Sequence, residues 1–294
     1  MGVLNYMKTA LSFNEGFRNI ERLIDLFGKH AIRAWIKQYK QGLNQYNTGK
    51  YNFWAPYFDK YFDFINKKKR SSVGNEAEVV DLMSMAHNVF AFEKNWNKDS
   101  GSRDVFLKRL GDTREVRSLL FELRIGVHYL AANYNVDIII CPEKQGFSKV
   151  PPPDLIIHYD ENLKVYVECI RRAPKKARWE NIEALIDDLI AALDDKRKSS
   201  VDWKKPRIVA IHIPEEINWQ ADSLRTELGK RVTRRFERKE YENVNVVAFS
   251  SDRKPVRLIG KGFEYYNTDV LNLHWLNPNG RYRLPDDFKL FLNF

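Results

Sequence analysis

The chain contains 294 residues with a mass of 34.8 kDa, long enough for two domains of ordinary size or for one large domain. Apolar residues make up 44% and charged residues 30%, a balance that excludes disordered and fibrous chains. The 49 Lys and Arg residues outnumber the 39 Asp and Glu residues, giving a formal net charge of +10. This excess favours an anionic partner, of which nucleic acid is the commonest kind.

The cysteine count and the length of the apolar runs exclude several further classes of protein. Cys141 and Cys169 are too few for a disulfide scaffold or a four-thiolate zinc site. No apolar run approaches the roughly 18 residues of a membrane span, and residues 1–8 lack the core of a signal peptide. We therefore expect a cytoplasmic protein with no membrane interaction.

The first third of the chain is predicted to be helical and is its more basic part. Residues 1–110 hold 18 basic and 11 acidic side chains. Apolar residues recur at helical spacing from Ile20 to Phe27, and Gly28 follows as a stop signal. Further helices are expected at 31–39 and 76–92. A loop at 95–101 is the predicted boundary between a helical, aromatic-rich region (1–100) and a second domain (101–294).

Nine aromatic residues lie between Tyr46 and Phe64. One interpretation is functional, since aromatic rings beside lysines can stack on the bases of single-stranded nucleic acid. The other is structural, because positions 54, 57, 58, 61 and 62 form one face of a helix, as a core requires. We favour the core.

Two basic segments are candidate nucleic-acid-binding surfaces. The first is the run Lys67, Lys68, Lys69 and Arg70. The second is a helix near 219–240 that carries, among other basic residues, Arg231, Arg234, Arg235 and Arg238. A polyanion could lie along either segment. The alternative is that both are solvated helix surfaces.

The second part of the chain alternates helices and strands. The predicted order is helix, three strands, helix, strand, helix and strand, at residues 116–130, 136–141, 155–159, 163–170, 182–193, 208–213, 224–236 and 244–249. Alternation of this kind predicts an α/β fold with a mixed sheet and helices packed on its faces.

Two acidic residues stand where the second and third strands can bring them together. Asp154 opens the second strand and Glu168 lies near the end of the third, and only the turn at 160–162 separates the two strands. Paired carboxylates repel each other unless a cation or a proton relieves them, and oxygen ligands suit Mg²⁺ or Mn²⁺. A third acid, Glu122, lies at the border of the apolar face of the 116–130 helix. The structural alternative is that Asp154 caps a turn, Glu168 pairs with Arg171 or Arg172, and Glu122 merely flanks its helix.

These acids stand in the segments ELR (122–124), PD (153–154) and VEC (167–169), the last followed by two arginines. Over residues 111–250 the pattern resembles the PD-(D/E)XK, or restriction-endonuclease-like, nuclease superfamily. The resemblance implies a core of a helix, a three-strand meander, a crossover helix and a further strand. It also implies a divalent-metal phosphodiesterase in which Asp154 and Glu168 hold the metal and Glu122 assists.

One position departs from that pattern. The family has a lysine two residues after the second acid, where this chain has Ile170. Residues 168 and 170 share a face of a regular strand, so isoleucine takes the lysine's place. A replacement cation could come from Arg172, Lys149, Lys175 or His158. An arginine there would stabilise charge, because a guanidinium stays protonated and is a poor general base.

The sequence thus leads to two main hypotheses. The first is a Mg²⁺- or Mn²⁺-dependent nuclease that hydrolyses phosphodiester bonds of DNA rather than RNA, with Glu122, Asp154, Glu168 and Arg172 as catalytic residues and a homodimer as one arrangement. The second is a catalytically impaired nuclease-fold protein that acts as a nucleic-acid-binding or protein-assembly module. A protein-interaction role of the N-terminal helices is a third, weaker interpretation.

Overall fold

The computed structural model describes most of the chain, in residues 10–44, 52–66, 77–140, 152–171, 182–199, 204–213, 222–252, 258–259, 264–266 and 270–290. Two sets of candidate residues lie outside these ranges, namely Lys67, Lys68, Lys69 and Arg70, and Arg172. Lys149 and Lys175 lie outside them as well.

The described residues divide into two compact units. The helical unit holds 10–120 together with 258–259 and 264–266, and the sheet unit holds 121–252 and 270–290. The boundary between the two units falls between residues 120 and 121, inside a helix, whereas the sequence analysis placed the domain boundary in the segment 95–101. That segment holds the ends of two helices, with only 97–99 between them.

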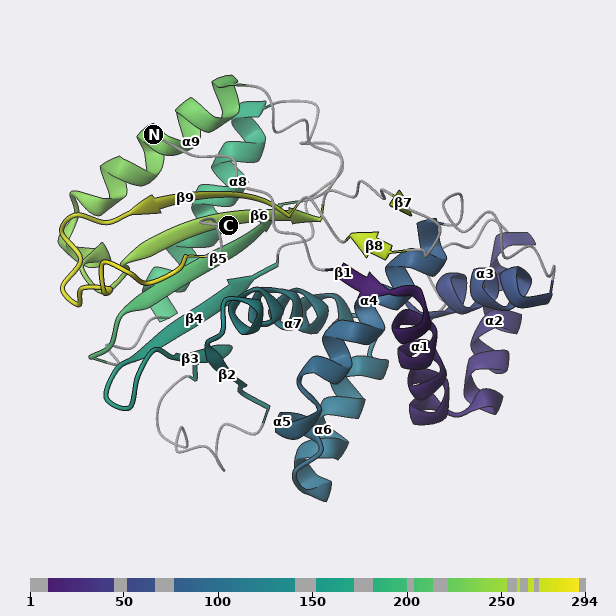
Figure 1. Ribbon diagram of the computed structural model, residues 1–294. Helices are drawn as coiled ribbons and strands as arrows, with labels where there is room; N and C mark the ends of the chain where they lie inside the picture. Colours follow the sequence, from purple (N-terminus) through teal and green to yellow (C-terminus); the bar gives the residue numbers. More distant parts are fainter. Residues whose placement is uncertain are drawn as a thin grey trace. The chain divides into compact units, whose positions relative to one another are not determined.

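Helices make up most of the helical unit (Figure 1). They are α1 (Phe13–Phe27), α2 (Lys29–Asn44), α3 (Ala55–Asn66), α4 (Ala77–Ala91), α5 (Glu93–Trp96) and α6 (Ser100–Gly111). Gly28 separates α1 from α2 with a positive φ of 82°, a conformation that glycine adopts without strain. Short strands β1 (Ala10–Ser12), β7 (Leu258–Ile259) and β8 (Glu264–Tyr266) form a sheet in the order β1-β8-β7.

The aromatic cluster of α3 forms the core of the helical unit, as we favoured. The side chains of Trp54, Phe58 and Tyr61 are at most 2% exposed. Phe27 of α1 contacts the rings of Trp54 and Phe58, at centroid distances of 5.5 and 6.3 Å. The indole nitrogen of Trp54 donates to the Leu110 carbonyl at 2.8 Å, which satisfies its polar atom. The rings that the structure describes in this cluster are therefore mainly packing residues.

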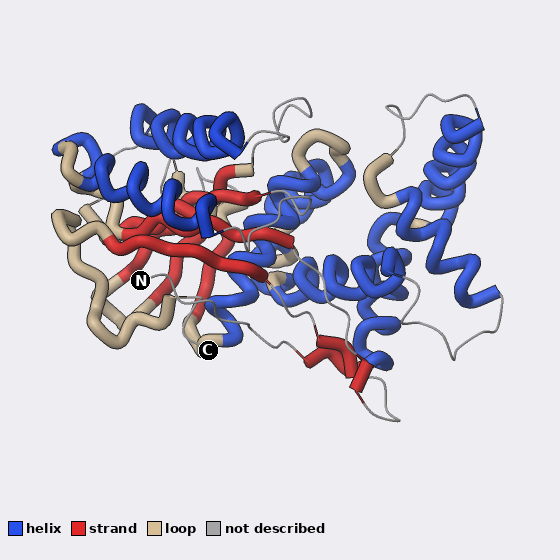
Figure 2. The backbone as a smooth tube through the Cα atoms, turned by 90° about the horizontal axis from the view of Figure 1, so that it is seen from above, coloured by secondary structure: helices blue, strands red, loops and turns tan. Residues whose placement is uncertain are grey.

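The sheet unit is built on a six-stranded mixed sheet, shown in red on the left of Figure 2. Its strands are β2 (Asn135–Ile138), β3 (Leu155–His158), β4 (Lys164–Ile170), β5 (Arg207–Ile213), β6 (Val246–Asp252) and β9 (Val270–Leu276). The order is β2-β3-β4-β5-β6-β9. Strands β2, β3 and β4 form an antiparallel meander, β4, β5 and β6 run parallel, and β9 pairs antiparallel with β6.

Three helices cover this sheet, with a short 3₁₀ helix η4 (Lys239–Tyr241) before β6. α8 (Ile182–Ser199) and α9 (Asp222–Phe236) pack on one face, in a core that contains Ile170, Val209 and Phe249. α7 (Val116–Ala131) packs on the other face through residues from 121 onward, where the Phe121 ring lies 5.2 Å from the His212 ring. Parity along β5 separates the two faces, because odd residues meet α8 and α9 while His212 meets α7.

The structure confirms the predicted α/β class with a mixed sheet, and its helices and strands follow the predicted order. The first predicted strand ends earlier than expected, at Ile138 instead of residue 141, and the helix that begins at 182 continues to Ser199. Strand β9 was not predicted at all. None of the helices in the described ranges has both the length and the apolar character that crossing a membrane requires.

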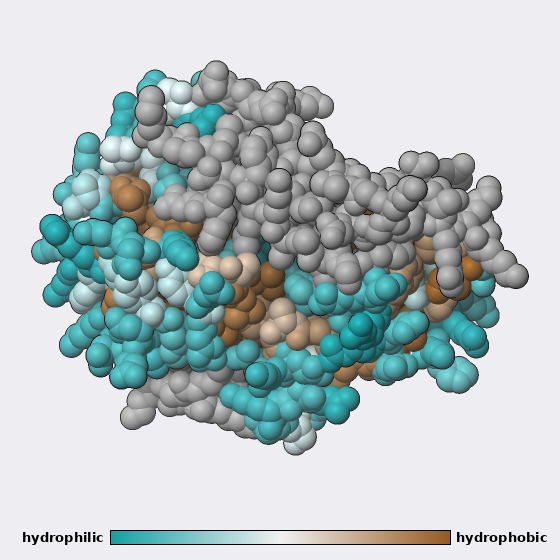
Figure 3. Space-filling model, viewed as in Figure 1, coloured by the Kyte–Doolittle hydropathy of each residue, from teal (hydrophilic) through white to brown (hydrophobic). Residues whose placement is uncertain are grey.

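The described surface is largely hydrophilic on the face seen in Figure 3. Among the described residues, the large apolar side chains that are exposed are Ile65, Val105 and Leu276. Scattered apolar residues of this kind are ordinary on a protein surface and do not mark an interface.

Candidate functional site

Asp154 and Glu168 lie at neighbouring positions of the β3–β4 hairpin, as the sequence predicted. Leu155 pairs with Val167, and the Asp154 backbone nitrogen donates to the Val167 carbonyl at 3.0 Å. The Asp154 side chain also has a structural role, because its Oδ2 accepts a hydrogen bond from the Cys169 backbone nitrogen at 2.6 Å. One of its two carboxylate oxygens is thus bound to the backbone of β4.

The carboxylate of Glu168 forms an ion pair with the guanidinium of Arg207, on the first residue of β5. Both residues are almost fully buried, with 4% and 1% exposure. Buried charges require a partner, because each loses its hydration when it leaves water. Arg207 supplies the positive charge that the sequence interpretation assigned either to a metal ion or to Arg171 or Arg172.

The backbone around Arg207 is held firmly. The Arg207 backbone nitrogen donates to the Asn245 side-chain oxygen at 2.8 Å, and the Asn245 backbone nitrogen donates to the Arg207 backbone carbonyl at 2.9 Å. Asn245 is itself 5% exposed and stands just before β6. These bonds fix the start of β5 beside β4, where Tyr166 and Arg207 are in register. The guanidinium is therefore placed by strand pairing, not by a mobile loop.

Ile170 takes an apolar position in the core on the α8–α9 face. It is 7% exposed and belongs to the same buried cluster as Leu185 and Val209. A lysine at this position would be surrounded by apolar side chains. Arg171 has the opposite parity and interacts electrostatically with His212, on the α7 face.

Glu122 is carried by the helix on the opposite face of the sheet from Glu168. It is 4% exposed on α7, one residue after Phe121, whose ring contacts His212. Glu168 is in register with Val209, which faces α8 and α9. Among the residues that the structure describes, no three His, Cys, Asp or Glu side chains gather as a metal ion would need. The residues present therefore do not fit the three-acid metal site.

The α7 face carries a buried polar cluster that sequence reasoning missed. Arg124 donates to the Ser250 hydroxyl at 3.2 Å. Burial, and then the charge of Arg124, lower the pKa of His128 to about 3 and that of His212 to about 2. Both histidines are consequently neutral at pH 7, so neither provides a cation for a phosphate. The signal available in the sequence was the presence of His212 and Ser250 in apolar strands.

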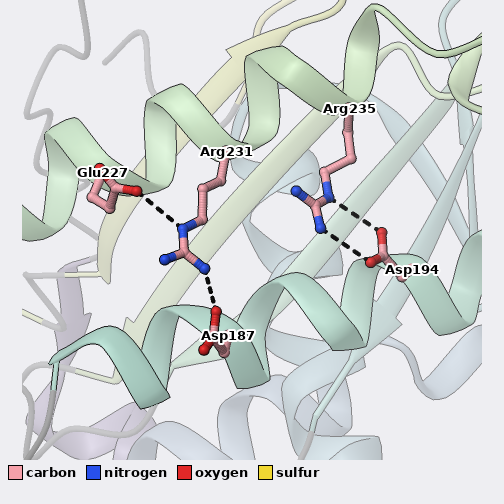
Figure 4. Close-up of polar contacts among 5 residues, drawn as sticks. All are labelled: Asp187, Asp194, Glu227, Arg231 and Arg235. Carbon is pink, nitrogen blue, oxygen red and sulfur yellow. Dashed lines mark hydrogen bonds and ion pairs between the residues drawn. The ribbon is translucent and has the colours of Figure 1, made fainter.

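The four arginines predicted to bind nucleic acid near 219–240 divide into two groups. Figure 4 shows Arg231 and Arg235 extending toward α8. Arg231 binds Asp187 of α8 and Glu227 of its own helix, the latter at 3.0 Å, and Arg235 binds Asp194 at 3.3 Å. Arg234 of α9 and Arg238, which lies between α9 and η4, are exposed. Only part of the predicted basic surface is thus directed at solvent.

Comparison with known proteins identifies no relative of this chain, since no family model, curated protein or solved structure matches it.

Proposed function

We propose that the sheet unit is a restriction-endonuclease-like domain that binds DNA without hydrolysing it. The support for the fold is the succession of α7, the meander β2-β3-β4, the crossover helix α8 and the parallel strand β5. This is the order that the resemblance implied. The support for an anionic partner is the net charge of +10.

The observation that carries the proposal is the buried ion pair of Glu168 and Arg207. A metal ion at Glu168 would have to replace a guanidinium that is 1% exposed, and that guanidinium would then be left as an uncompensated buried charge. The core position of Ile170 supports the same conclusion, because no lysine extends from it toward an attacking water. We therefore infer that this site does not hydrolyse DNA through a metal ion bound at Glu168.

The test combines a cleavage assay with a binding assay. Supercoiled plasmid, linear duplex and single-stranded DNA are incubated with the protein in Mg²⁺ or Mn²⁺. Anisotropy of labelled oligonucleotides measures binding at 50 mM salt. We expect binding without cleavage.

Two variants make the outcome specific. Asp154→Asn removes a charge at the hairpin while keeping a side-chain oxygen for the Cys169 amide, and Glu161→Gln removes a charge from the exposed hairpin turn. Both should bind DNA as the native chain does. Cleavage by the native chain that Asp154→Asn abolishes and Glu161→Gln retains would instead establish a nuclease. Absence of binding at 50 mM salt would contradict a role in nucleic-acid binding.

A further inference from the structure

The helical unit contains an open pocket that the proposed function does not use. The pocket has a volume of about 270 Å³ and lies among α1, the end of α4, α5 and the start of α6. Ligand pockets for drug-sized molecules span about 300–1,000 Å³, so the occupant that fits here is small. All of its lining residues belong to the helical unit.

Apolar side chains form one part of its wall, namely Leu26, Phe90 and Trp96. Trp96 is 2% exposed and stacks on Phe106, with ring centroids 5.0 Å apart and planes 4° from parallel. Its indole nitrogen donates to the Val89 carbonyl at 2.9 Å, which satisfies its one polar atom. Trp96 is thus held in place and almost fully covered, and the apolar surface open to a ligand comes from the half-buried Leu26 and Phe90.

Two of the four charged residues in the lining neutralise each other. Arg22 Nη2 lies 2.5 Å from Glu93 Oε2, and the Arg22 guanidinium lies 3.9 Å from the centroid of the Phe90 ring. This contact joins α1 to α5. A bound molecule would therefore meet the Arg22–Glu93 pair as a nearly neutral group.

The other two charged residues are Asp25 and Arg103, one of each sign. Both are exposed, and within the described part of the chain neither forms an ion pair. The pocket thus presents one carboxylate and one guanidinium beside an apolar wall, with a formal charge of zero. A nucleotide phosphate would be repelled by Asp25, and a hydrocarbon alone would strip water from both charges without replacing it.

We propose that this pocket binds a small zwitterion with an apolar side chain, of the class of free α-amino acids. The ammonium group is bound by Asp25, the carboxylate is bound by Arg103, and the side chain packs on Leu26 and Phe90. Charge-assisted hydrogen bonds to the two ends give the selectivity, because a ligand that lacks either charge leaves one protein charge without a partner.

The test measures binding by calorimetry on the full chain. The probes are L-leucine and L-phenylalanine, with the N-acetyl and amide derivatives of each, and adenosine and AMP. We expect binding of at least one free amino acid, and a loss of about tenfold in affinity when either charged end is blocked. Binding of AMP in preference to the amino acids, or no binding of either amino acid, would overturn the proposal.

Variants locate the site. Asp25→Asn and Arg103→Gln should each weaken binding about tenfold. Asp104→Asn on α6 and Arg18→Gln on α1 remove the same charges from exposed positions outside the pocket and should leave binding unchanged. All four positions are exposed, so thermal unfolding should show native-like melting in each variant. Equal effects of the pocket variants and their controls would also overturn the proposal.

Discussion

Glu168 and Arg207 together form a buried pair in which each charge depends on the other. Replacing Arg207 by methionine leaves a carboxylate with 4% exposure beside a hydrocarbon chain. We expect Arg207→Met to lower the free energy of unfolding by about 3–5 kcal/mol. The measurement is urea unfolding followed by tryptophan fluorescence, with the exposed Arg234→Met as a control that should change little.

The double variant Glu168→Met/Arg207→Met isolates the pairing. It removes both charges and fills their space with apolar atoms, so it should be much more stable than the sum of the two single changes predicts. Additive losses would mean that the two side chains do not depend on each other, and would weaken the argument against a metal at Glu168.

The buried histidines predict how stability depends on pH. Burial and Arg124 lower the pKa of His128 to about 3 and that of His212 to about 2, whereas both titrate near 6.5 in an unfolded chain. As pH falls below 6.5, the unfolded chain binds protons that the folded chain does not. The stabilisation is complete above pH 6.5 and is lost toward pH 3, by about 1.4 kcal/mol per pH unit for each histidine.

His128→Gln should therefore reduce the slope of unfolding free energy against pH by about 1.4 kcal/mol per unit between pH 6 and pH 4. Urea titrations at several pH values measure this slope, which is insensitive to a constant loss of stability in the variant. Identical slopes in the native chain and His128→Gln would contradict a neutral buried His128.

At the scale of elements, α9 has two distinct faces. Arg231 and Arg235 bind acids of α8 (Figure 4), while Arg234, and Arg238 just after the helix, are exposed. Ion pairs that are partly open to water contribute about 0–1 kcal/mol each. The first pair of arginines thus contributes modestly to helix packing, and the second pair is available to a polyanion.

Two double variants with the same change in net charge separate these roles. Arg234→Gln/Arg238→Gln should weaken DNA binding and reduce the magnitude of its log–log salt slope by about 2, with little change in stability. Arg231→Gln/Arg235→Gln should lower the free energy of unfolding by about 1–2 kcal/mol and leave the salt slope nearly unchanged. Equal effects of both variants on DNA binding would show that only net charge matters and that α9 is not a specific surface.

The elements of the sheet unit could largely be predicted from the sequence, because apolar periodicity reports which residues meet a core. β9 escaped prediction since Asn272 and His274 interrupt its apolar pattern. The hairpin that places Asp154 beside Glu168 also followed from a short turn. The pairing of Glu168 with Arg207 could not be predicted, because it depends on the register of β4 with β5. These two strands are separated in the chain by α8. Arg171 is nearer in sequence, but alternation directs its side chain to the other face.

At the scale of the whole molecule, the net charge of +10 attracts anions over a long range, and dissolved salt should screen this attraction. Residues 1–110 hold 18 of the 49 basic residues but only 11 of the 39 acidic ones. A protein that neutralises phosphates releases condensed counterions, so its affinity for duplex DNA falls linearly on a log–log plot against salt, with a slope of about −0.9 for each phosphate contact. The charge distribution therefore predicts binding that is governed by salt rather than by base sequence.

The measurement is the anisotropy of two duplexes of unrelated sequence between 50 and 200 mM salt. We expect the same steep slope for both, because contacts to phosphate carry no sequence information. A matched variant, Lys164→Gln/Lys289→Gln, lowers the net charge by two at the β2–β3–β4 side of the sheet, since Lys164 pairs with His158 of β3 and the Lys289 backbone nitrogen donates to the Tyr134 hydroxyl just before β2. The Lys164→Gln/Lys289→Gln variant should change the salt slope of DNA binding less than Arg234→Gln/Arg238→Gln does. A slope near zero, or strong preference for one duplex, would mean that the excess of basic residues serves a different partner or that base contacts dominate.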